Sequence, residues 1–581
     1  MEIAFQYIDT ILVFAVFALS LNLLQGYAGQ VSVAQAAFGA IGGYALALLF
    51  LDAGVGPAWG LAIGTIAAGF AGFLVGLPAL RLTTEWLILL TLAVQTIVVT
   101  LVQTDHALGG SFGLQNVAGL RIFGLPLDEP SQMFPLFLVL AAIVYLTCYR
   151  LGESPYGRVL RAIRDDATAC RSLGKRVYAY KLTVFSLTAA MAGLAGAMLV
   201  IETSIASPTL FSFDQSAVIV AMVVIGGAGN LNGSLVGVAV LTLLAPLFDR
   251  LLPFNEQAAF VLRLVAYGAV LVAVLLVRPQ GLYPDAITRR LERALRRGGP
   301  ALEVGAEAAL EPAIPSVEIV RQPSRDVPRD VVVSAEGLCK KFGGIVAADD
   351  LSFRLFRGHV SALVGPNGAG KTTVFNLLTG AIKPDAGRVV LRGEDVTNAT
   401  PDQIARSGMA RSFQSVRIFP RLSTLENVML AIPGQPGEHL VPLFLQWRGT
   451  SAAERAAREI ARNWLHFVGM GAHEDAPAGA LAFGEQKLVA LARVLATDAE
   501  VLLLDEPASG VDRRWVDAML EVIASLRDAG RTICIVEHNL HVVERLADHT
   551  YFMELGKITA EGDFNTLTAD RRLVEAYFGV V

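Results

Sequence analysis

Eight apolar stretches in the first half of the chain are each long enough to cross a lipid bilayer. An α-helix needs about 20 mainly apolar residues to span roughly 30 Å of hydrocarbon. The stretches lie at 3–24, 31–51, 57–77, 86–103, 133–149, 181–201, 233–252 and 258–277. A shorter run at 214–229 is either a ninth span or a re-entrant segment. We therefore expect an all-α, polytopic membrane domain of eight or nine helices over residues 1–284.

The composition separates the chain into a membrane part and a soluble part. Of the 581 residues, 54% are hydrophobic and 17% are charged, whereas a soluble domain has about 25% charged residues. The apolar excess lies in 1–284, and 331–581 have the mixture of a soluble domain. The stretch 285–330 between them holds five prolines. It predicts a basic helix near 286–297 followed by a flexible tether.

Charge, cysteines and the first apolar stretch narrow the classes of function. The formal net charge of -5 does not favour a nucleic-acid partner. The four cysteines lie far apart without a C-x-x-C pattern, which favours neither a disulfide framework nor a zinc site and suits a reducing cytosol. Residues 1–24 lack a basic n-region and a small-residue cleavage site, so we interpret them as a retained membrane helix.

Basic loops predict the orientation of the membrane domain. Eight lysines and arginines stand against three acidic residues between 150 and 181, and six arginines follow the last span. The positive-inside rule places both loops in the cytoplasm. This arrangement favours 214–229 as a real span, which puts the N-terminus outside and the soluble domain in the cytosol.

The loop 150–181 also carries an amphipathic pattern. Apolar residues recur there at helical spacing, with arginines on the other face: Val159, Leu160, Ile163, Ala167, Cys170 and Leu173. The spacing predicts a short helix at the cytoplasmic surface. The residues leave two readings open. The helix either presses into a groove on a soluble partner, or is a solvated basic loop that serves only topology.

Small and polar residues recur within the spans. Glycine pairs at four-residue spacing, such as Gly39 with Gly43 and Gly60 with Gly64, let helix backbones approach closely. We expect them to pack helices within one subunit rather than to form a dimer face. Polar residues such as Asn22 and Gln95 either line a polar path or form helix–helix hydrogen bonds.

The soluble part of the chain contains a candidate phosphate-binding loop. The apolar run Val360–Val364 reads as a buried strand, and the pattern G-x-x-x-x-G-K-T follows it. The candidate nucleotide-binding residues are Gly365, Pro366, Asn367, Gly368, Ala369, Gly370, Lys371, Thr372 and Thr373. Glycines let several N–H groups point at one anion, Lys371 supplies charge for the β- and γ-phosphates of ATP, and Thr372 offers a hydroxyl to Mg²⁺. The alternative is a glycine-rich strand–helix turn without a ligand.

Two further strand ends carry groups suited to ATP hydrolysis. The apolar strand 501–504 ends in Asp505, a candidate ligand of Mg²⁺, and Glu506, a candidate general base for the attacking water. A second apolar strand, 532–536, precedes His538, which is placed to donate a hydrogen bond to the γ-phosphate. Phe342 lies 29 residues before Lys371 and either stacks on adenine or belongs to the core. Together these motifs predict an α/β domain that hydrolyses a nucleoside triphosphate.

Residues 331–581 resemble the nucleotide-binding domain of ABC transporters. The resemblance implies that Gln414 is the glutamine that senses the γ-phosphate and its Mg²⁺. It also implies that 481–486 form the signature motif, with Ala482, Gly484 and Glu485 completing the ATP site of a partner. Asp512 then belongs to the D-loop at 509–512. Ala482 departs from the common serine, so the composite ATP site built with it is expected to be the weaker one.

Finer matches narrow the resemblance to importers of branched-chain amino acids. The stretches 342–344, 411–419 and the insertion 432–460 resemble the LivG-type ATPase. The matches to the LivM-type permease are 21–30, 76–81, 154–158, 161–164, 224–229 and 278–282. In this family the loop 150–181 is the coupling element that docks on the ATPase. The resemblance thus implies ATP-driven import across the bacterial inner membrane.

The same resemblance implies partners and leaves competing functions. One chain supplies one permease and one ATPase domain, so a LivH-type permease with a LivF-type ATPase, or a second copy, is required, together with an extracytoplasmic solute-binding protein. Amides, urea and aromatic acids are alternative solutes within the family. A half-exporter is a competing function, although its helices usually extend far into the cytosol. A non-transport ATPase of DNA repair or translation does not fit eight apolar spans.

Overall fold

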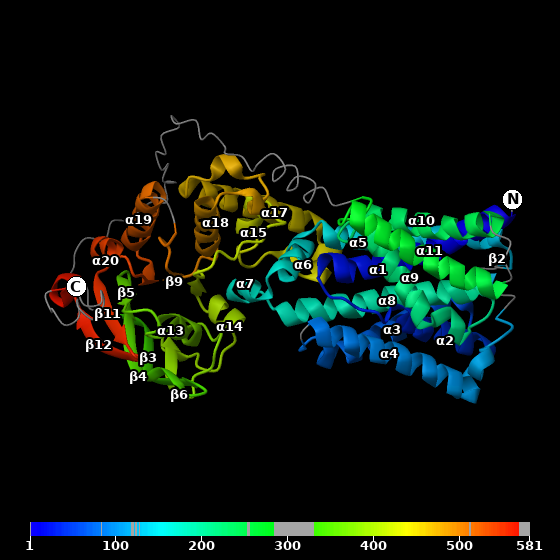
Figure 1. The fold of residues 1–581 in the computed structure, drawn as a ribbon, viewed down its shortest axis with the longest axis horizontal. Coiled ribbons are helices and arrows are strands. Elements are labelled where there is room, and N and C mark those ends of the chain that lie inside the picture. The colour runs from blue at the N-terminus through cyan, green and yellow to red at the C-terminus, as the bar shows by residue number, and fades with distance from the viewer. Residues whose placement is uncertain are drawn as a thin grey trace. The chain divides into compact units, whose positions relative to one another are not determined.

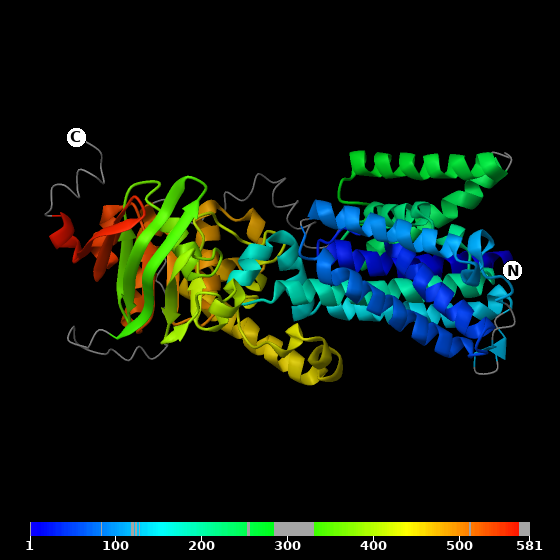
Figure 2. The ribbon, with the colours of Figure 1, turned by 90° about the horizontal axis from the view of Figure 1, so that it is seen from below.

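The computed structural model describes residues 2–82, 84–117, 121–122, 125–126, 128–251, 256–283, 330–510 and 513–568 (Figures 1 and 2). The expected basic helix at 286–297, the tether and Asp512 fall outside these residues. The chain forms two compact units, one of Met1–Arg164 with Val177–Arg289 and one of Asp165–Arg176 with Arg290–Val581. The short segment Asp165–Arg176 thus belongs to the second unit, although it lies between helices of the first along the chain.

The described part of the first unit is a helical bundle. Its long helices are α1 (Glu2–Leu21), which continues as a π-helix (Asn22–Tyr27), α2 (Gln35–Leu51), α3 (Pro57–Ala79), α4 (Thr84–Thr104), α5 (Pro130–Gly152), α8 (Val177–Thr203), α9 (Phe213–Gly226), α10 (Leu231–Leu251) and α11 (Glu256–Val277). Short elements join them: α6 (Pro155–Asp165), 3-10 turns at His106–Leu108, Gly110–Phe112 and Pro208–Phe211, and a two-stranded ribbon of β1 (Arg121–Ile122) and β2 (Leu125–Pro126).

The apolar helices fall into two groups by the length of their apolar part within the described residues. Among the described residues, the five long and apolar enough to cross a membrane are α1 with its π-helix, α3, α4, α5 and α8. The shorter apolar helices are α2, α9 and parts of α10 and α11. Helix α9 has 14 residues, which at 1.5 Å per residue reach roughly 21 Å. The run predicted as a ninth span or a re-entrant segment is therefore a short helix.

Glycines bring α2, α3 and α8 into close contact. A Cβ atom at Gly42 of α2 would lie 2.1 Å from the carbonyl oxygen of Gly193 in α8. A Cβ atom at Gly64 of α3 would lie 2.6 Å from the carbonyl oxygen of Gly42. The backbones approach so closely that no side chain fits between them. The expectation that the glycines pack helices within one subunit is confirmed at these contacts.

Buried polar side chains in the bundle form hydrogen bonds between elements. The amide oxygen of Gln95 accepts from the backbone N–H of Ala37 at 2.8 Å, and its amide nitrogen donates to the carbonyl of Phe211 at 2.7 Å. Asn22 likewise donates to the carbonyl of Asn230 at 2.8 Å. At Asn22 and Gln95 the structure thus supports the hydrogen-bond reading.

The amphipathic loop forms two helices where one was expected. Helix α6 ends at Asp165, and α7 runs from Ala167 to Ser172. Asp166 separates them because its carboxylate accepts from the N–H groups of Thr168 and Ala169 and so caps α7. The single-helix prediction was wrong at this position, since the N-cap starts a new helix.

The described residues of the second unit form two sheets (Figures 1 and 2). A six-stranded sheet has the order β12 (Lys557–Gly562), β11 (His549–Glu554), β5 (Val360–Val364), β10 (Thr532–Val536), β9 (Val501–Asp505) and β8 (Met409–Arg411). Its strands pair in parallel except β12, which is antiparallel to β11. An antiparallel sheet has the order β4 (Ile345–Phe356), β3 (Val331–Phe342), β6 (Ala386–Leu391) and β7 (Glu394–Asp395).

Helices accompany these sheets along the chain. They are α13 (Lys371–Leu378), α14 (Pro401–Arg406), α15 (Thr424–Met429), α16 (Leu440–Leu445), α17 (Trp447–Phe467), α18 (Phe483–Leu495), α19 (Arg513–Asp528), α20 (Leu540–Leu546) and α21 (Phe564–Thr568). Strands β5, β9 and β10 are buried along their whole length. Continuous apolar strands of this kind belong in a parallel sheet that is covered on both faces.

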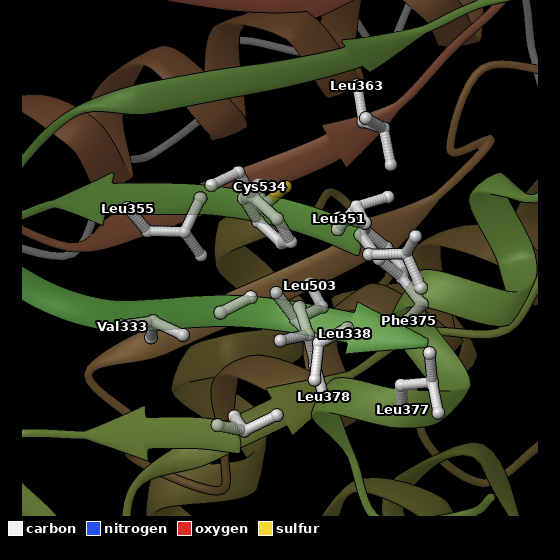
Figure 3. Close-up of a cluster of buried hydrophobic side chains, with 14 of the residues drawn as sticks. Val333, Leu338, Leu351, Leu355, Leu363, Phe375, Leu377, Leu378, Leu503 and Cys534 are labelled. Atoms are coloured by element: carbon white, nitrogen blue, oxygen red, sulfur yellow. The ribbon is translucent and has the colours of Figure 1, made fainter. Parts of the chain in front are cut away.

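The core of the second unit lies between its two sheets and α13. Figure 3 shows Val333 and Leu338 of β3, Leu351 of β4, Phe375 of α13 and Leu503 of β9 gathered in one cluster. All five are essentially inaccessible to solvent. This cluster fixes β5, β9 and α13 relative to one another, and these are the elements that carry the candidate site.

Candidate ATP-hydrolysis site

The phosphate-binding loop joins β5 to α13, as the motif predicts. Gly365 has φ +155° and Gly370 has φ +106°, in the region that favours glycine. A Cβ atom at Gly365 would lie 2.1 Å from the carbonyl oxygen of Met553, and one at Gly370 would lie 2.3 Å from that of Ala347. The loop therefore needs glycine for both its conformation and its packing. It ends at Gly370, the N-cap of α13, where free N–H groups favour an anion.

Lys371 begins α13 and folds back over this loop. Its ammonium donates to the carbonyls of Gly365 at 2.7 Å and Pro366 at 2.9 Å. Burial lowers the pKa of Lys371, and the carboxylates of Glu506 and Asp505 oppose this shift. The lysine is therefore close to both acidic residues, as a phosphate-binding lysine beside a metal site requires.

Asp505 ends β9 at the same sheet edge as the phosphate-binding loop, because β5, β10 and β9 are parallel neighbours. One carboxylate oxygen, Oδ2, accepts from the guanidinium of Arg411 at 3.0 Å, and this pair is almost fully buried. Burial raises the pKa of Asp505, and Arg411 opposes the shift. The other oxygen, Oδ1, is buried and has no hydrogen-bond partner among the described residues. A free buried carboxylate oxygen fits the oxygen ligands that Mg²⁺ prefers, and Thr372, an exposed residue of the first turn of α13, could offer its hydroxyl to the same ion.

Glu506 follows Asp505 and adopts φ +47°, which is uncommon for a residue other than glycine. Its backbone N–H donates to the carbonyl of Val536 at 2.9 Å. One carboxylate oxygen, Oε2, lies 3.8 Å from Nδ1 of His538. The structure therefore brings Glu506, His538, Asp505 and Lys371 together, which the sequence order predicted. A positive φ at a residue other than glycine, as at Glu506, is often found at functional positions.

Two buried residues that the sequence analysis did not select support this group. Lys487 of α18 donates to the carbonyls of Glu506 at 3.0 Å and Pro507 at 3.3 Å, and also to that of Ser509. Glu537 is fully buried and accepts from the N–H of Ala508 at 3.0 Å. Burial raises the pKa of Glu537, and the hydrogen bond from Ala508 opposes this shift. Both side chains hold the segment after Glu506. The sequence offered a signal for Glu537, because an acidic residue directly follows the apolar strand 532–536 and precedes His538.

Gln414 and Phe342 lie at the periphery of this group. Gln414 follows β8, which is parallel to β9, so it lies beyond the same sheet edge as Asp505, and it is exposed. Phe342 ends β3 in the other sheet and is 44% exposed, with the ammonium of Lys340 5.7 Å from its ring centre. An exposed ring is available for stacking, so Phe342 is not a core residue.

The signature segment forms the N-terminus of α18. Ala482 is its N-cap, and its N–H donates to the carboxylate of Glu485 at 2.8 Å. Glu485 is buried, and by accepting this hydrogen bond it caps its own helix. Gly484 is partly exposed, and Phe483 is half exposed. The free surface of this segment thus consists of Ala482, Phe483 and Gly484, while Glu485 shapes it from within.

The segment Asp165–Arg176 packs within the second unit through buried and charged contacts. Cys170 of α7 is fully buried beside Arg493 of α18, whose guanidinium lies 4.9 Å from the ring centre of Phe419. Burial lowers the pKa of Arg493 to about 10, and Cys170 and Asp166 oppose the shift. The prediction that this loop docks on the ATPase is confirmed for these residues.

Three ion pairs add to this contact. Asp166 pairs with Arg417 at 2.9 Å, and Asp165 lies 3.9 Å from Arg421. Lys175 pairs with Glu438, and both side chains are at most 10% exposed. Arg417 and Arg421 follow Gln414 by three and seven residues. The docked segment is thus tied to the chain that follows the candidate γ-phosphate sensor.

Comparison with known protein families gives two matches. Residues 3–277 match the family described as a branched-chain amino acid transport system, permease component. Residues 348–509 match the ABC transporter family. The two matches fall on either side of the stretch 285–330.

Individual relatives match the second part of the chain. The high-affinity branched-chain amino acid transport ATP-binding protein LivG of Escherichia coli is 35% identical over 249 residues, which are 43% of this chain and 98% of LivG. The corresponding protein BraF of Pseudomonas aeruginosa is 32% identical over the same shares. A solved nucleotide-free ATP-binding cassette from an ABC transporter is 31% identical, with a TM-score of 0.38, and covers 43% of this chain and all of that chain.

Proposed function

The chain belongs to the ABC transporters of branched-chain amino acids, and we propose that it imports such a solute into the cell. It joins a permease domain to an ATPase that couples hydrolysis to transport. The observation that carries the proposal is this fusion of a family-specific permease with a LivG-like ATPase in one chain. We place the chain in the bacterial inner membrane with the ATPase in the cytoplasm.

The proposed import direction is also supported by the short loop between α5 and α8. Helices α6 and α7 have 11 and 6 residues, and α5 ends at Gly152. A half-exporter would extend its membrane helices far into the cytosol instead. Branched-chain amino acids are the proposed solutes because the relatives' names specify them. Amides, urea and aromatic acids remain the alternatives.

In the proposed mechanism, backbone N–H groups of 365–373 and the ammonium of Lys371 bind the phosphates of ATP. Glu506 orients and deprotonates the attacking water, and His538 donates a hydrogen bond toward the γ-phosphate. Asp505, Thr372 and Gln414 would hold Mg²⁺, which neutralises phosphate charge when bound. Phe342 would stack on the adenine.

The exposed signature surface at Ala482 and Gly484 supports the proposal of a second ATPase, because in this chain it has no assigned role at the phosphate-binding loop. We propose that this surface and Asp512 complete a composite ATP site in a partner, a LivF-type ATPase with a LivH-type permease. A second copy of this chain is the alternative. An extracytoplasmic binding protein would deliver the solute. Closure of the two ATPases then moves the permease through the docked segment Asp165–Arg176.

The test is ATP-dependent uptake by the full chain in right-side-out vesicles that contain ATP, the candidate subunits and the binding protein. Uptake of leucine, isoleucine or valine is expected, and Glu506→Gln should retain ATP binding but abolish both hydrolysis and uptake. Glu521→Gln, an exposed position on α19, is the matched control and should behave as the parent. ATP-driven efflux of the solute from these vesicles would refute import, and full hydrolysis by Glu506→Gln would remove Glu506 from its role.

A further inference from the structure

The insertion 432–460 carries an exposed apolar surface. Four large apolar side chains gather there, which we call the insertion tip: Val441 is 66% exposed, Phe444 40%, Leu445 78% and Trp447 56%. They lie on α16 and at the start of α17, whose yellow ribbon projects from the body of the second unit in Figure 2. Water-exposed apolar side chains gathered in this way indicate an interaction surface.

The tip is held firmly by its neighbours. Leu443 of α16 is 4% exposed and Thr450 of α17 is 7% exposed. The Thr450 hydroxyl donates to the carbonyl of Gln446, and Gln435 donates to the carbonyl of Met429 at 2.7 Å just before the tip. The exposed side chains are therefore presented by an ordered scaffold.

Chain connectivity limits how far the insertion tip can lie from the start of α8. Glu438 pairs with Lys175, and α8 begins two residues after Lys175, at Val177. Helix α8 has 27 residues, which at 1.5 Å each reach roughly 40 Å, more than the 30 Å hydrocarbon core. The start of a spanning α8 thus lies at headgroup depth. Val441 follows Glu438 by three residues, at most roughly 10 Å of chain.

The charge and composition of the tip match a lipid surface. From His439 to Ala453 the sequence has no acidic residue, and its one arginine is Arg448. The Arg448 guanidinium lies 5.4 Å from the ring centre of Trp447. Tryptophan beside a basic residue is enriched where proteins meet the membrane–water interface, and a basic residue is attracted to anionic headgroups.

We propose that the insertion tip enters the headgroup and acyl boundary of the cytoplasmic leaflet. Val441, Leu445 and Trp447 contact lipid there, and Arg448 contacts anionic headgroups. The tip then forms a second attachment of the ATPase to the bilayer, beside the docked segment Asp165–Arg176. The proposal depends on the membrane placement of α8 and not on the solute or on the direction of transport.

The experiment places a fluorescent label on the tip of the full chain. Leu445→Cys is made in a Cys339→Ser background, because the other three cysteines are buried, and is labelled with a polarity-sensitive maleimide. Leu555→Cys is the matched control, since Leu555 is 80% exposed in the turn between β11 and β12. Both chains are reconstituted in nanodiscs of zwitterionic and anionic lipid, with or without lipid that carries a quenching nitroxide near the headgroup.

The tip label is expected to emit at shorter wavelength than the control and to be quenched about twofold, because the insertion depth is roughly 5–10 Å. The control should remain unquenched. Emission typical of water and no quenching at Leu445→Cys would overturn the proposal. Emission at shorter wavelength without quenching would also overturn it, because a protein partner then covers the tip. Val441→Cys gives a second site on the tip if Leu445→Cys unfolds at a lower temperature than its parent.

Discussion

The pair of Lys175 and Glu438 offers a direct measurement of how firmly the permease segment is docked. Both side chains are nearly buried, so removing Lys175 takes from the Glu438 carboxylate the cation that balances its charge in this pair. Breaking a buried ion pair costs about 3–5 kcal/mol, and each 1.4 kcal/mol is tenfold in an equilibrium constant. We take the lower end because neither side chain is fully inaccessible. Lys175→Met should therefore raise the opening equilibrium of the docked segment roughly a hundredfold.

Hydrogen–deuterium exchange of the full chain in nanodiscs measures this opening. The reporters are the amides of Thr168 and Ala169, which Asp166 holds by hydrogen bonds. Their exchange should accelerate in Lys175→Met, and uptake should fall more than ATP hydrolysis because the ATPase is uncoupled. The double variant Lys175→Met/Glu438→Gln should recover most of the protection, since no unpaired charge remains.

A surface pair supplies the control for this measurement. Arg531 and Asp498 form an ion pair in which Asp498 is 78% exposed at its side chain. Arg531→Met should cost at most about 1 kcal/mol and leave exchange of the docked segment unchanged. Equal exchange in Lys175→Met and the parent would refute the reasoning, and so would a double variant that is less protected than Lys175→Met.

Two further predictions concern the ATP site. Gly370→Ala should weaken nucleotide binding more than about tenfold, because its Cβ atom would meet the Ala347 carbonyl at φ +106°; Gly344→Ala, with open space around it, should not, and equal nucleotide affinity in both would contradict this. Burial raises the pKa of Glu537, so its contribution to stability is present below the unfolded pKa and is lost as pH rises through the folded one. Glu537→Gln should therefore gain thermal stability relative to the parent as pH rises from about 4.5, the ordinary glutamate range; a gain on acidification instead would show the opposite sign.

The sequence predicts the fold of the second unit well where function and local structure use the same residues. The strand before Gly365 and the strand that ends at Asp505 are mainly apolar and buried, so their place in one parallel sheet, on either side of β10, follows from composition. The positions of Lys371, Glu506 and His538 then follow from the shared sheet edge.

Contacts between distant side chains could not be predicted in the same way. Lys487 reaches carbonyls about 20 residues away, and Arg411 pairs with Asp505 across 94 residues. Neither contact leaves a periodic or spaced pattern in the sequence. The boundary between α6 and α7 at Asp166 could have been predicted, because aspartate is a favoured N-cap residue.

The docked segment Asp165–Arg176 makes the second unit discontinuous along the chain. Synthesis proceeds from the N-terminus, so the ribosome produces this piece of the unit before α8 and long before Arg493, beside which Cys170 is buried. Completion of the catalytic half therefore waits on successful insertion of the half that precedes it. A nascent chain that fails to integrate would display unpaired buried charge and apolar surface, which gives cellular proteolysis a means to recognise defective copies.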